Sequence, residues 1–274
     1  MAHGRYTMTE AKQRRFEREK RGQGDGPNYR PYFTVSDVPS RGRSHRLACA
    51  LTGWRTHHLL SDNECAAFLE AWWDINTRDV KEQYPLPLKE TVSIAARLGV
   101  KHPRDSRSGV LLVQTTDLVV IKKLDGKTLV HPVAAKDEKE LLKDRVLEKL
   151  EIERVYWEEQ GIHWGLATNE GLNANTSKNL MMLLETENDI GCRELTDREV
   201  DAANALLVRI DRGGAEAILT ACKEVERRRA LRGGDGIRAL RQLLLTQRVA
   251  CDLEVWQILD LPVESFQILD SRAE

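Results

Sequence analysis

Two residues of this 274-residue chain stand out because their types could do chemistry in otherwise apolar surroundings. Asp117 interrupts the apolar stretch GVLLVQTTDLVV, and Lys136 ends the apolar run that follows it. An acid inside a buried strand is costly unless something pairs with it. A carboxylate on one strand and a lysine at the end of its partner would face a common site. That site is either a buried ion pair or a reaction centre, and these two residues alone leave both interpretations open.

Glu64 adds a second carboxylate and suggests what the chemistry would be. Hydrolysis of a phosphodiester needs a metal ion that neutralises the phosphate and generates hydroxide near neutral pH. Hard cations such as Mg²⁺ take carboxylate and carbonyl oxygens, and a nearby lysine can stabilise the phosphate or position the water. Glu64 also has a structural interpretation, because Ser61-Asp62-Asn63-Glu64 is a capping box. Since acids make up 43 of 274 residues, the spacing by itself favours the structural interpretation.

The segments that carry these residues predict an α/β layer with a mixed sheet. The Asp125-Gly126 pair between two apolar runs predicts a hairpin over residues 109–136, because it tolerates the positive φ of a tight turn. A helix is predicted to start at Ser61, a strand over 78–88 and a short helix over 91–98. After Lys136, the pattern predicts one long helix over 137–160 and a buried strand over 162–168.

The composition changes near Asn169, after which long strand runs are absent. Helices are predicted over 173–185, 196–210, 215–229 and 236–248. The tail contains QILD at Gln257 and again at Gln267, which we interpret as two short strands of a wing. The predicted domains are therefore a basic N-terminal arm (1–27), an α/β domain (28–168) and a mainly helical, winged-helix-like domain (169–274).

The overall net charge of −1 hides a basic N-terminal region. Residues 1–60 hold twelve Lys and Arg residues against five acids, and Arg41, Arg43, His45 and Arg46 cluster in SRGRSHRL. This excess predicts either a phosphate-binding surface or a solvated arm. Five scattered cysteines without a C-x-x-C pair fit reduced thiols. No membrane span and no secretory signal are predicted, so we expect a cytoplasmic protein.

Six stretches, taken in order, resemble the TnsA endonuclease family of Tn-seven-like transposons. They are SRGRSHR (40–46), HHLLSDNE (57–64), EQYPL (82–86), VKHP (100–103), TTDLVV (115–120) and LEKLEIERVYW (147–157). Order and spacing agree over roughly residues 20–185, and the C-terminal third matches more loosely.

The resemblance implies a restriction-endonuclease-like catalytic domain with Glu64, Asp117 and Lys136 as its catalytic residues. It implies Mg²⁺, which Mn²⁺ would replace, held by Glu64, Asp117 and the Ala135 carbonyl. This fold often carries Glu or Gln two residues before the lysine, and Ala134 departs from that pattern. A register that puts His131 at the lysine position would need a five-residue insertion, so Lys136 is preferred.

The resemblance also implies an activity and partners. The family nicks the 5′ ends of the transposon during cut-and-paste transposition, together with a TnsB-like integrase and a TnsC-like ATPase that binds the C-terminal domain. DNA would contact the basic segment through Arg41, Arg43, His45 and Arg46. Two alternatives are a non-catalytic DNA-binding or assembly module, which Ala134 motivates, and a generic restriction or repair nuclease of the same fold.

Overall fold

A computed structural model describes residues 4, 6–39, 42–191 and 193–269, and the chain divides into two compact units, Met1–Leu172 and Asn173–Glu274. The boundary thus follows Leu172, a few residues after the change in composition. Part of the predicted basic arm forms helix α1 (Glu10–Arg18) inside the first unit. Phe16 anchors this helix, because its ring is fully buried against Tyr32.

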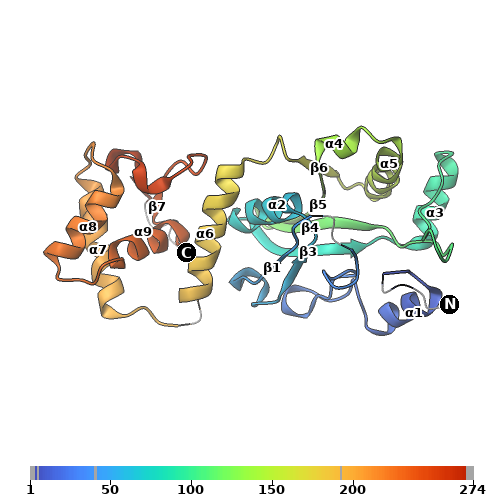
Figure 1. The fold of residues 1–274 in the computed structure, drawn as a ribbon, viewed down its shortest axis with the longest axis horizontal. Helices are drawn as coiled ribbons and strands as arrows, with labels where there is room; N and C mark the ends of the chain where they lie inside the picture. The colour runs from blue at the N-terminus through green and yellow to red at the C-terminus, as the bar shows by residue number, and fades with distance from the viewer. Residues whose placement is uncertain (1–3, 5, 40–41, 192, 270–274) are drawn as a thin grey trace. The chain divides into compact units, whose positions relative to one another are not determined.

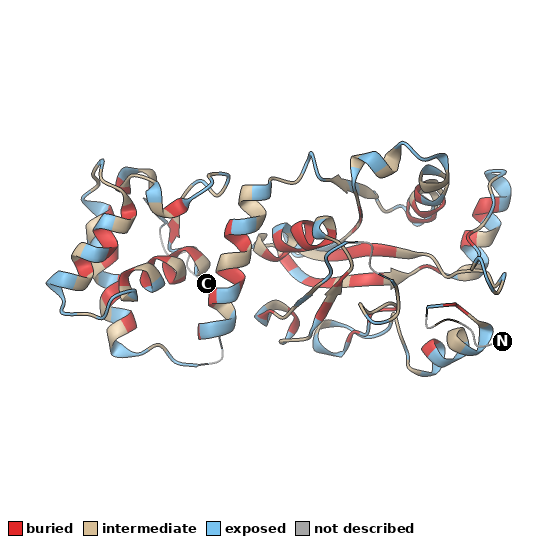
Figure 2. Cartoon of the chain, in the orientation of Figure 1, coloured by how far each residue is buried: buried red, intermediate tan, exposed pale blue. Residues whose placement is uncertain are grey.

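A mixed four-stranded sheet of order β3-β4-β5-β6 forms the centre of the first unit (Figure 1). Its strands are β3 (Thr77–Pro85), β4 (Thr115–Leu124), β5 (Lys127–Lys136) and β6 (Gly165–Thr168). The first three are antiparallel, whereas β5 and β6 are parallel. The β4–β5 turn uses Asp125 (φ 49°) and Gly126 (φ 75°), which confirms the predicted hairpin turn. The mixed sheet is as predicted, and the first half of β4, from Thr116 to Val120, is buried (Figure 2).

Helices lie on both faces of this sheet. Helix α2 (Asp62–Trp73) contacts β3, β4 and β5, whereas α3 (Leu88–Arg97) and α5 (Asp144–Glu159) share an apolar cluster with Val119 on β4. The alternate residues Leu118 and Val120 line a hollow with Ala67 of α2, so α2 covers the opposite face. The single long helix predicted over 137–160 is wrong, because a short α4 (Glu138–Leu141) precedes α5.

Residues 28–60, which gave no clear element in the sequence, hold a small ribbon beside the sheet. Strands β1 (His45–Leu47) and β2 (His57–Leu59) pair in antiparallel register. Short 3-10 turns η1 (Gly26–Asn28) and η2 (Ala50–Thr52) connect the surrounding chain. The side chain of His57 on β2 is fully buried and bonds to Glu82 of β3, which fixes the ribbon to the sheet.

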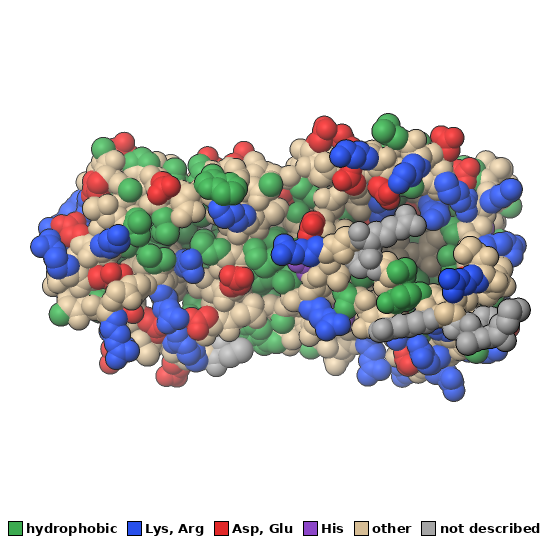
Figure 3. Space-filling view, viewed as in Figure 1, with side chains coloured by type: hydrophobic (Ala, Val, Ile, Leu, Met, Phe, Trp, Pro, Cys, Tyr) green, Lys and Arg blue, Asp and Glu red, His purple; other side chains and the backbone are tan. Residues whose placement is uncertain are grey.

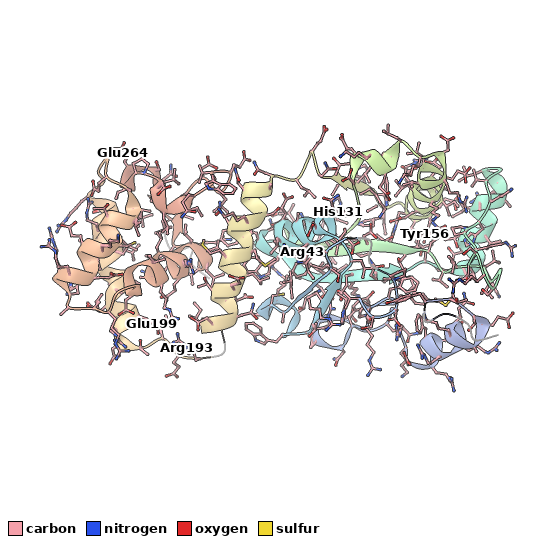
Figure 4. All side chains as sticks on the ribbon, in the orientation of Figure 1. Arg43, His131, Tyr156, Arg193, Glu199 and Glu264 are labelled. Carbon is pink, nitrogen blue, oxygen red and sulfur yellow. The ribbon has the colours of Figure 1, made fainter. Side chains whose placement is uncertain are left out.

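The second unit is a bundle of four helices with a short strand pair. Its elements are α6 (Ala174–Ile190), α7 (Asp197–Asp211), α8 (Ile218–Arg228), α9 (Asp235–Leu245), β7 (Val249–Ala250) and β8 (Gln267–Ile268). Thr196 and Glu199 form a capping box at the start of α7, and Arg193 binds the same glutamate at 2.6 Å (Figure 4). The four predicted helices are therefore present with shifted ends.

The predicted wing differs from what the structure shows. The first QILD copy is not a strand, because Ile258–Asp260 forms the 3-10 turn η3, followed by η4 (Val263–Ser265). The second copy contributes β8, which pairs with β7 instead. The repeat misled the prediction because four residues carry too little pattern to separate a strand from a turn. The winged-helix assignment stays a prediction.

Within the described residues, none of the helices combines the length and the apolar character that spanning a membrane requires.

Candidate active site

Asp117 lies where strands β4 and β5 part. Their paired register ends at Leu118 and Val133, one residue short of Asp117. Beyond that point β5 continues beside β6, and the Asp117 side chain replaces the missing main-chain partner. Its Oδ2 accepts a hydrogen bond from Ala135 N at 2.9 Å and another from Lys136 Nζ at 2.5 Å. The fork therefore directs the carboxylate and the lysine to one place, as the hairpin suggested.

The ammonium group of Lys136 also donates to the carbonyl oxygen of Ala135 at 3.0 Å. The two oxygens predicted as metal ligands on β4 and β5 thus converge on one cation, which here is the lysine. Burial opposes the charge on Lys136, but the adjacent Asp117 outweighs it and raises the pKa of the lysine. The carboxylate of Asp117 and the ammonium of Lys136 form a largely buried ion pair.

Glu64 reaches the same region from the first turn of α2. Its carboxylate accepts hydrogen bonds from Leu60 N at 2.8 Å and from Gln83 Nε2 at 3.1 Å, both on Oε2. Ser61 Oγ accepts from Glu64 N, so Ser61 is the N-cap, although the glutamate bonds Leu60 N rather than the cap amide. Within the described part of the chain, no cationic group bonds to Glu64, which is only 5% exposed. Burial, followed by repulsion from Asp117, raises its pKa to about 8.

Glu153 of α5 is a third buried carboxylate that the sequence reasoning missed. Burial and then the negative charge of Asp117 raise its pKa to about 7, and Trp164 Nε1 donates to it at 3.1 Å. A signal for it exists in the sequence. Glu153 falls three residues after Leu150 and four before Trp157, on the stripe of α5 that is buried. An acid on that apolar stripe indicates a buried carboxylate, which is costly unless it has a partner or a function.

The donor set suits a hard cation by its chemistry. Carboxylates of Glu64 and Asp117 and the carbonyl of Ala135 are oxygen ligands of the kind that Mg²⁺ prefers. Ala134 is fully buried and offers no side-chain oxygen, whereas Glu153 brings an acid to this region from α5. Across the part of the chain that the structure describes, no cluster of three or more His, Cys, Asp or Glu side chains is arranged to hold an ion. The predicted set of two carboxylates and one backbone oxygen matches the donor types that a hard cation takes, and it stays a prediction.

Three of the residues predicted to bind DNA, Arg43, His45 and Arg46, lie on or beside the β1–β2 ribbon. Arg43 and Arg46 are exposed (Figure 4 labels Arg43), whereas His45 Nε2 is within 2.7 Å of Asp62 Oδ1. Arg46 pairs with His58 across the ribbon. Arg41 lies outside the described residues. His131, the alternative to Lys136, lies earlier on β5 opposite Val120, and Lys136 is the residue that contacts Asp117.

Comparison with known proteins defines the class as an endonuclease. Residues 74–169, which include Asp117, Lys136 and Glu153, match the family described as TnsA-like endonuclease N terminal. Across 226 residues the chain is 38% identical to the transposon Tn7 transposition protein TnsA of Escherichia coli. The aligned stretch covers 82% of this chain and 80% of that protein. The chain therefore belongs to the TnsA endonuclease family. Glu64 lies outside the range that the N-terminal family matches.

Proposed function

We propose that this protein is the endonuclease subunit of a transposase and nicks the 5′ ends of the transposon during cut-and-paste transposition. Membership of the TnsA endonuclease family and the similarity to the Tn7 transposition protein support this proposal. The observation that carries it is the convergence of Asp117 Oδ2, the Ala135 carbonyl and Lys136 at the fork between β4 and β5. The fork combines the two oxygen ligands and the lysine that metal-assisted phosphodiester hydrolysis requires.

In this proposal, Glu64, Asp117 and the Ala135 carbonyl hold Mg²⁺, for which Mn²⁺ substitutes. The ion would polarise the scissile phosphate and lower the pKa of a bound water. Lys136 then no longer has to neutralise Asp117, and its ammonium becomes available to the phosphate or to the attacking water. Asp117, the Ala135 carbonyl and Lys136 all lie on strands β4 and β5, which keeps their positions fixed through the reaction.

The DNA backbone is proposed to lie against the basic surface of the first unit. Exposed Arg43 and Arg46 belong to the ribbon region. Helix α1 adds the exposed cations Arg14, Arg15 and Arg18, and Lys20 follows the helix. Figure 3 shows Lys and Arg side chains gathered along the edge that α1 forms. Glu10 and Glu19 pair with two of these arginines, but such exposed pairs are weak enough for phosphates to compete. Affinity should therefore fall with salt.

The proposed partners are a TnsB-like integrase, which would cut and join the 3′ ends, and a TnsC-like ATPase bound by the second unit. Requiring the assembled complex for cleavage would protect the host from free nuclease activity. Cleavage of plain plasmid by this protein alone would instead indicate a generic restriction or repair nuclease.

The test is strand-specific cleavage of end-labelled transposon DNA by the purified partners with Mg²⁺. Asp117→Ala should abolish 5′ cleavage, because it removes a metal ligand and the partner of Lys136. The matched control is Asp74→Ala, which breaks another Asp–Lys pair, between Asp74 at the end of α2 and Lys122 of β4 at 2.7 Å, and should leave cleavage intact. Unchanged 5′ nicking by Asp117→Ala would show that the assignment is wrong.

A second candidate function is a non-catalytic assembly module. The presence of Ala134 favours it, since this residue offers a metal ion no side-chain oxygen. Under this alternative, Glu64→Gln changes neither cleavage nor transposition. Under the proposal, Glu64→Gln reduces 5′ cleavage while 3′ cleavage by the integrase continues.

A further inference from the structure

Gln83 occupies a strained position directly beside the candidate active site. It has a φ of 49°, in the left-handed region, although it is not a glycine and lies inside strand β3. The β3–β4 register pairs Glu82 with Leu118 and Tyr84 with Thr116 but skips the position where Gln83 would face Asp117. A residue with a Cβ adopts this conformation at a cost, and such residues cluster at functional sites.

The strained backbone places a buried amide between two elements. Gln83 is 2% exposed. Its Nε2 donates to Glu64 Oε2 at 3.1 Å, and its Oε1 accepts from Thr115 Oγ1 at 3.1 Å. The amide therefore links the first turn of α2 to the start of β4, two residues before Asp117. A carboxylate accepts only from the NH₂ end of the amide, so the Thr115 bond to the other end fixes its orientation.

The backbone of Gln83 is held as firmly as its side chain. Its carbonyl oxygen accepts a hydrogen bond from Tyr32 N at 3.2 Å. The preceding residue, Glu82, is fully buried and paired with Arg55 and His57, so β3 cannot shift along the sheet without breaking that pairing. Gln83 thus transmits the rigid position of β3 to the side chain of Glu64.

We propose that Gln83 is a positioning residue of the nuclease centre. It holds Glu64 by Oε2, which leaves Oε1 as the oxygen offered to the metal ion. Among the described residues, Oε1 accepts one hydrogen bond, from Ser61 Oγ at 3.3 Å. The inference rests on the proposed function, because it assumes that Glu64 is a metal ligand. Outer partners of this kind orient ligands, and their loss typically lowers metal affinity or activity about ten- to a hundredfold.

The test uses Gln83→Met in the full chain, a change that keeps the side-chain length and removes both hydrogen bonds. Calorimetric titration with Mn²⁺ should show affinity about ten- to a hundredfold below that of the unchanged protein. The control is Gln13→Met, since Gln13 Nε2 also bonds across the fold, to the Leu111 carbonyl at 2.6 Å, without touching Glu64 or Asp117. It should bind Mn²⁺ as the unchanged protein does.

A second variant keeps the proposal testable if Gln83→Met does not fold. Thr115→Val keeps the branched shape that suits a strand and removes the bond that orients the amide, so it should weaken Mn²⁺ binding in the same direction by a smaller factor. Thermal unfolding separates the roles, because a purely structural residue would lower the melting temperature and leave the Mn²⁺ affinity of the folded protein unchanged. That result for either folded variant overturns the inference.

Failure of the inference is distinguishable from failure of the proposed function. If the unchanged protein binds Mn²⁺, Asp117→Ala does not, and Gln83→Met binds normally, Gln83 has no positioning role while the nuclease site stands. If neither the unchanged protein nor Asp117→Ala binds Mn²⁺, the proposed site and the inference built on it are both overturned.

Discussion

Glu82 and Glu64 are two buried glutamates in the first unit, and their surroundings shift their pKa values in opposite directions. Glu82 is fully buried, and Arg55 donates to both of its oxygens, at 2.7 and 2.8 Å, while His57 Nδ1 lies at 2.9 Å. Burial alone would raise the pKa of Glu82, but His57 and Arg55 outweigh it and lower the pKa. Glu64 has no cation in contact, so burial and Asp117 raise its pKa to about 8.

The difference separates a structural ion pair from a reaction site. Glu82 is a buried acid whose charge is neutralised by its own cations, so its carboxylate has no free oxygen for a metal ion. A buried acid beside a further acid has negative charge that one lysine only partly offsets, which is the situation of Glu64 beside Asp117. Clusters of perturbed carboxylates of the second kind are what metal and catalytic sites use.

The largest expected effect is on the free energy of unfolding, when the ion pair between Glu82 and Arg55 is broken. Glu82→Gln leaves the charge of Arg55, whose side chain is 6% exposed, buried without its partner. Such a loss costs about 3–5 kcal/mol of unfolding free energy, measurable by urea denaturation. Glu159→Gln, which breaks an exposed pair with Arg97, should cost less than about 1 kcal/mol. Equal costs for the two variants would contradict the structural role of Glu82.

The next largest effect is expected at the buried acids that have no cation of their own. Glu153→Gln keeps an acceptor for Trp164 and removes one negative charge near Asp117 and Lys136. We expect Mg²⁺ affinity to fall about tenfold to a hundredfold, because the negative charge of Glu153 attracts the ion and glutamine has the same shape without the charge. Glu151→Gln, an exposed position of α5 that pairs with Arg154, should leave the calorimetric affinity unchanged. No loss with Glu153→Gln would place that acid outside the metal site.

A pH prediction follows from the raised pKa of Glu64, which in the folded protein is about 8 against an unfolded value of 4.5. Between these values the folded chain holds a proton that the unfolded chain has lost. Without metal, the unfolding free energy therefore falls as pH rises through this window, by at most about 1.4 kcal/mol per pH unit for this group.

Urea denaturation in EDTA across this pH window measures that slope. Glu64→Gln should make the slope shallower, because the amide does not titrate. The exposed neighbour Asp62 provides a control through Asp62→Asn, which should keep the steeper slope. Identical slopes for Glu64→Gln and the unchanged protein would show that Glu64 does not titrate as described.

The smallest effect concerns the basic surface, where single charges act through solvent. Arg43→Ala and Arg46→Ala should each weaken binding to duplex DNA and reduce the slope of log affinity against log salt by about 0.9. Arg97→Ala, an exposed arginine on α3, is the matched control and should leave the slope unchanged. Fluorescence anisotropy at several salt concentrations gives the slopes, and equal slopes for all variants would exclude the ribbon as a DNA contact.

Local signals explain what the sequence could predict of the fold. The Asp125-Gly126 turn and two apolar runs predict the β4–β5 hairpin, because turn chemistry and alternation are properties of neighbouring residues. The break between α4 and α5 at Leu142 and Lys143 was missed, since no Gly or Pro marks it. The short ribbon strands of residues 45–59 were also missed, because three residues carry too little alternation.

The residues of the candidate site also differ in how far the sequence predicts them. The hairpin places Asp117 and Lys136 on neighbouring strands, so their common site was predictable, whereas their direct contact depends on side chains beyond the last register pair, Leu118 and Val133. Glu64 entered through family resemblance, because its approach to β3 depends on how α2 packs on the sheet. Glu153 was readable as an acid on the buried stripe of α5, whereas the strain at Gln83 has no sequence signal, since a left-handed glutamine in a strand follows from tertiary contacts.

The most direct test of the account is a calorimetric titration of the full chain with Mg²⁺, using the unchanged protein, Asp117→Ala and Asp74→Ala. The account predicts saturable binding by the unchanged protein and by Asp74→Ala, and its loss in Asp117→Ala. Asp117 and Asp74 both pair with a lysine, but only Asp117 lies beside uncompensated buried acids. Equal binding by all three proteins, or by none, would contradict the claim that the uncompensated acids form the metal site.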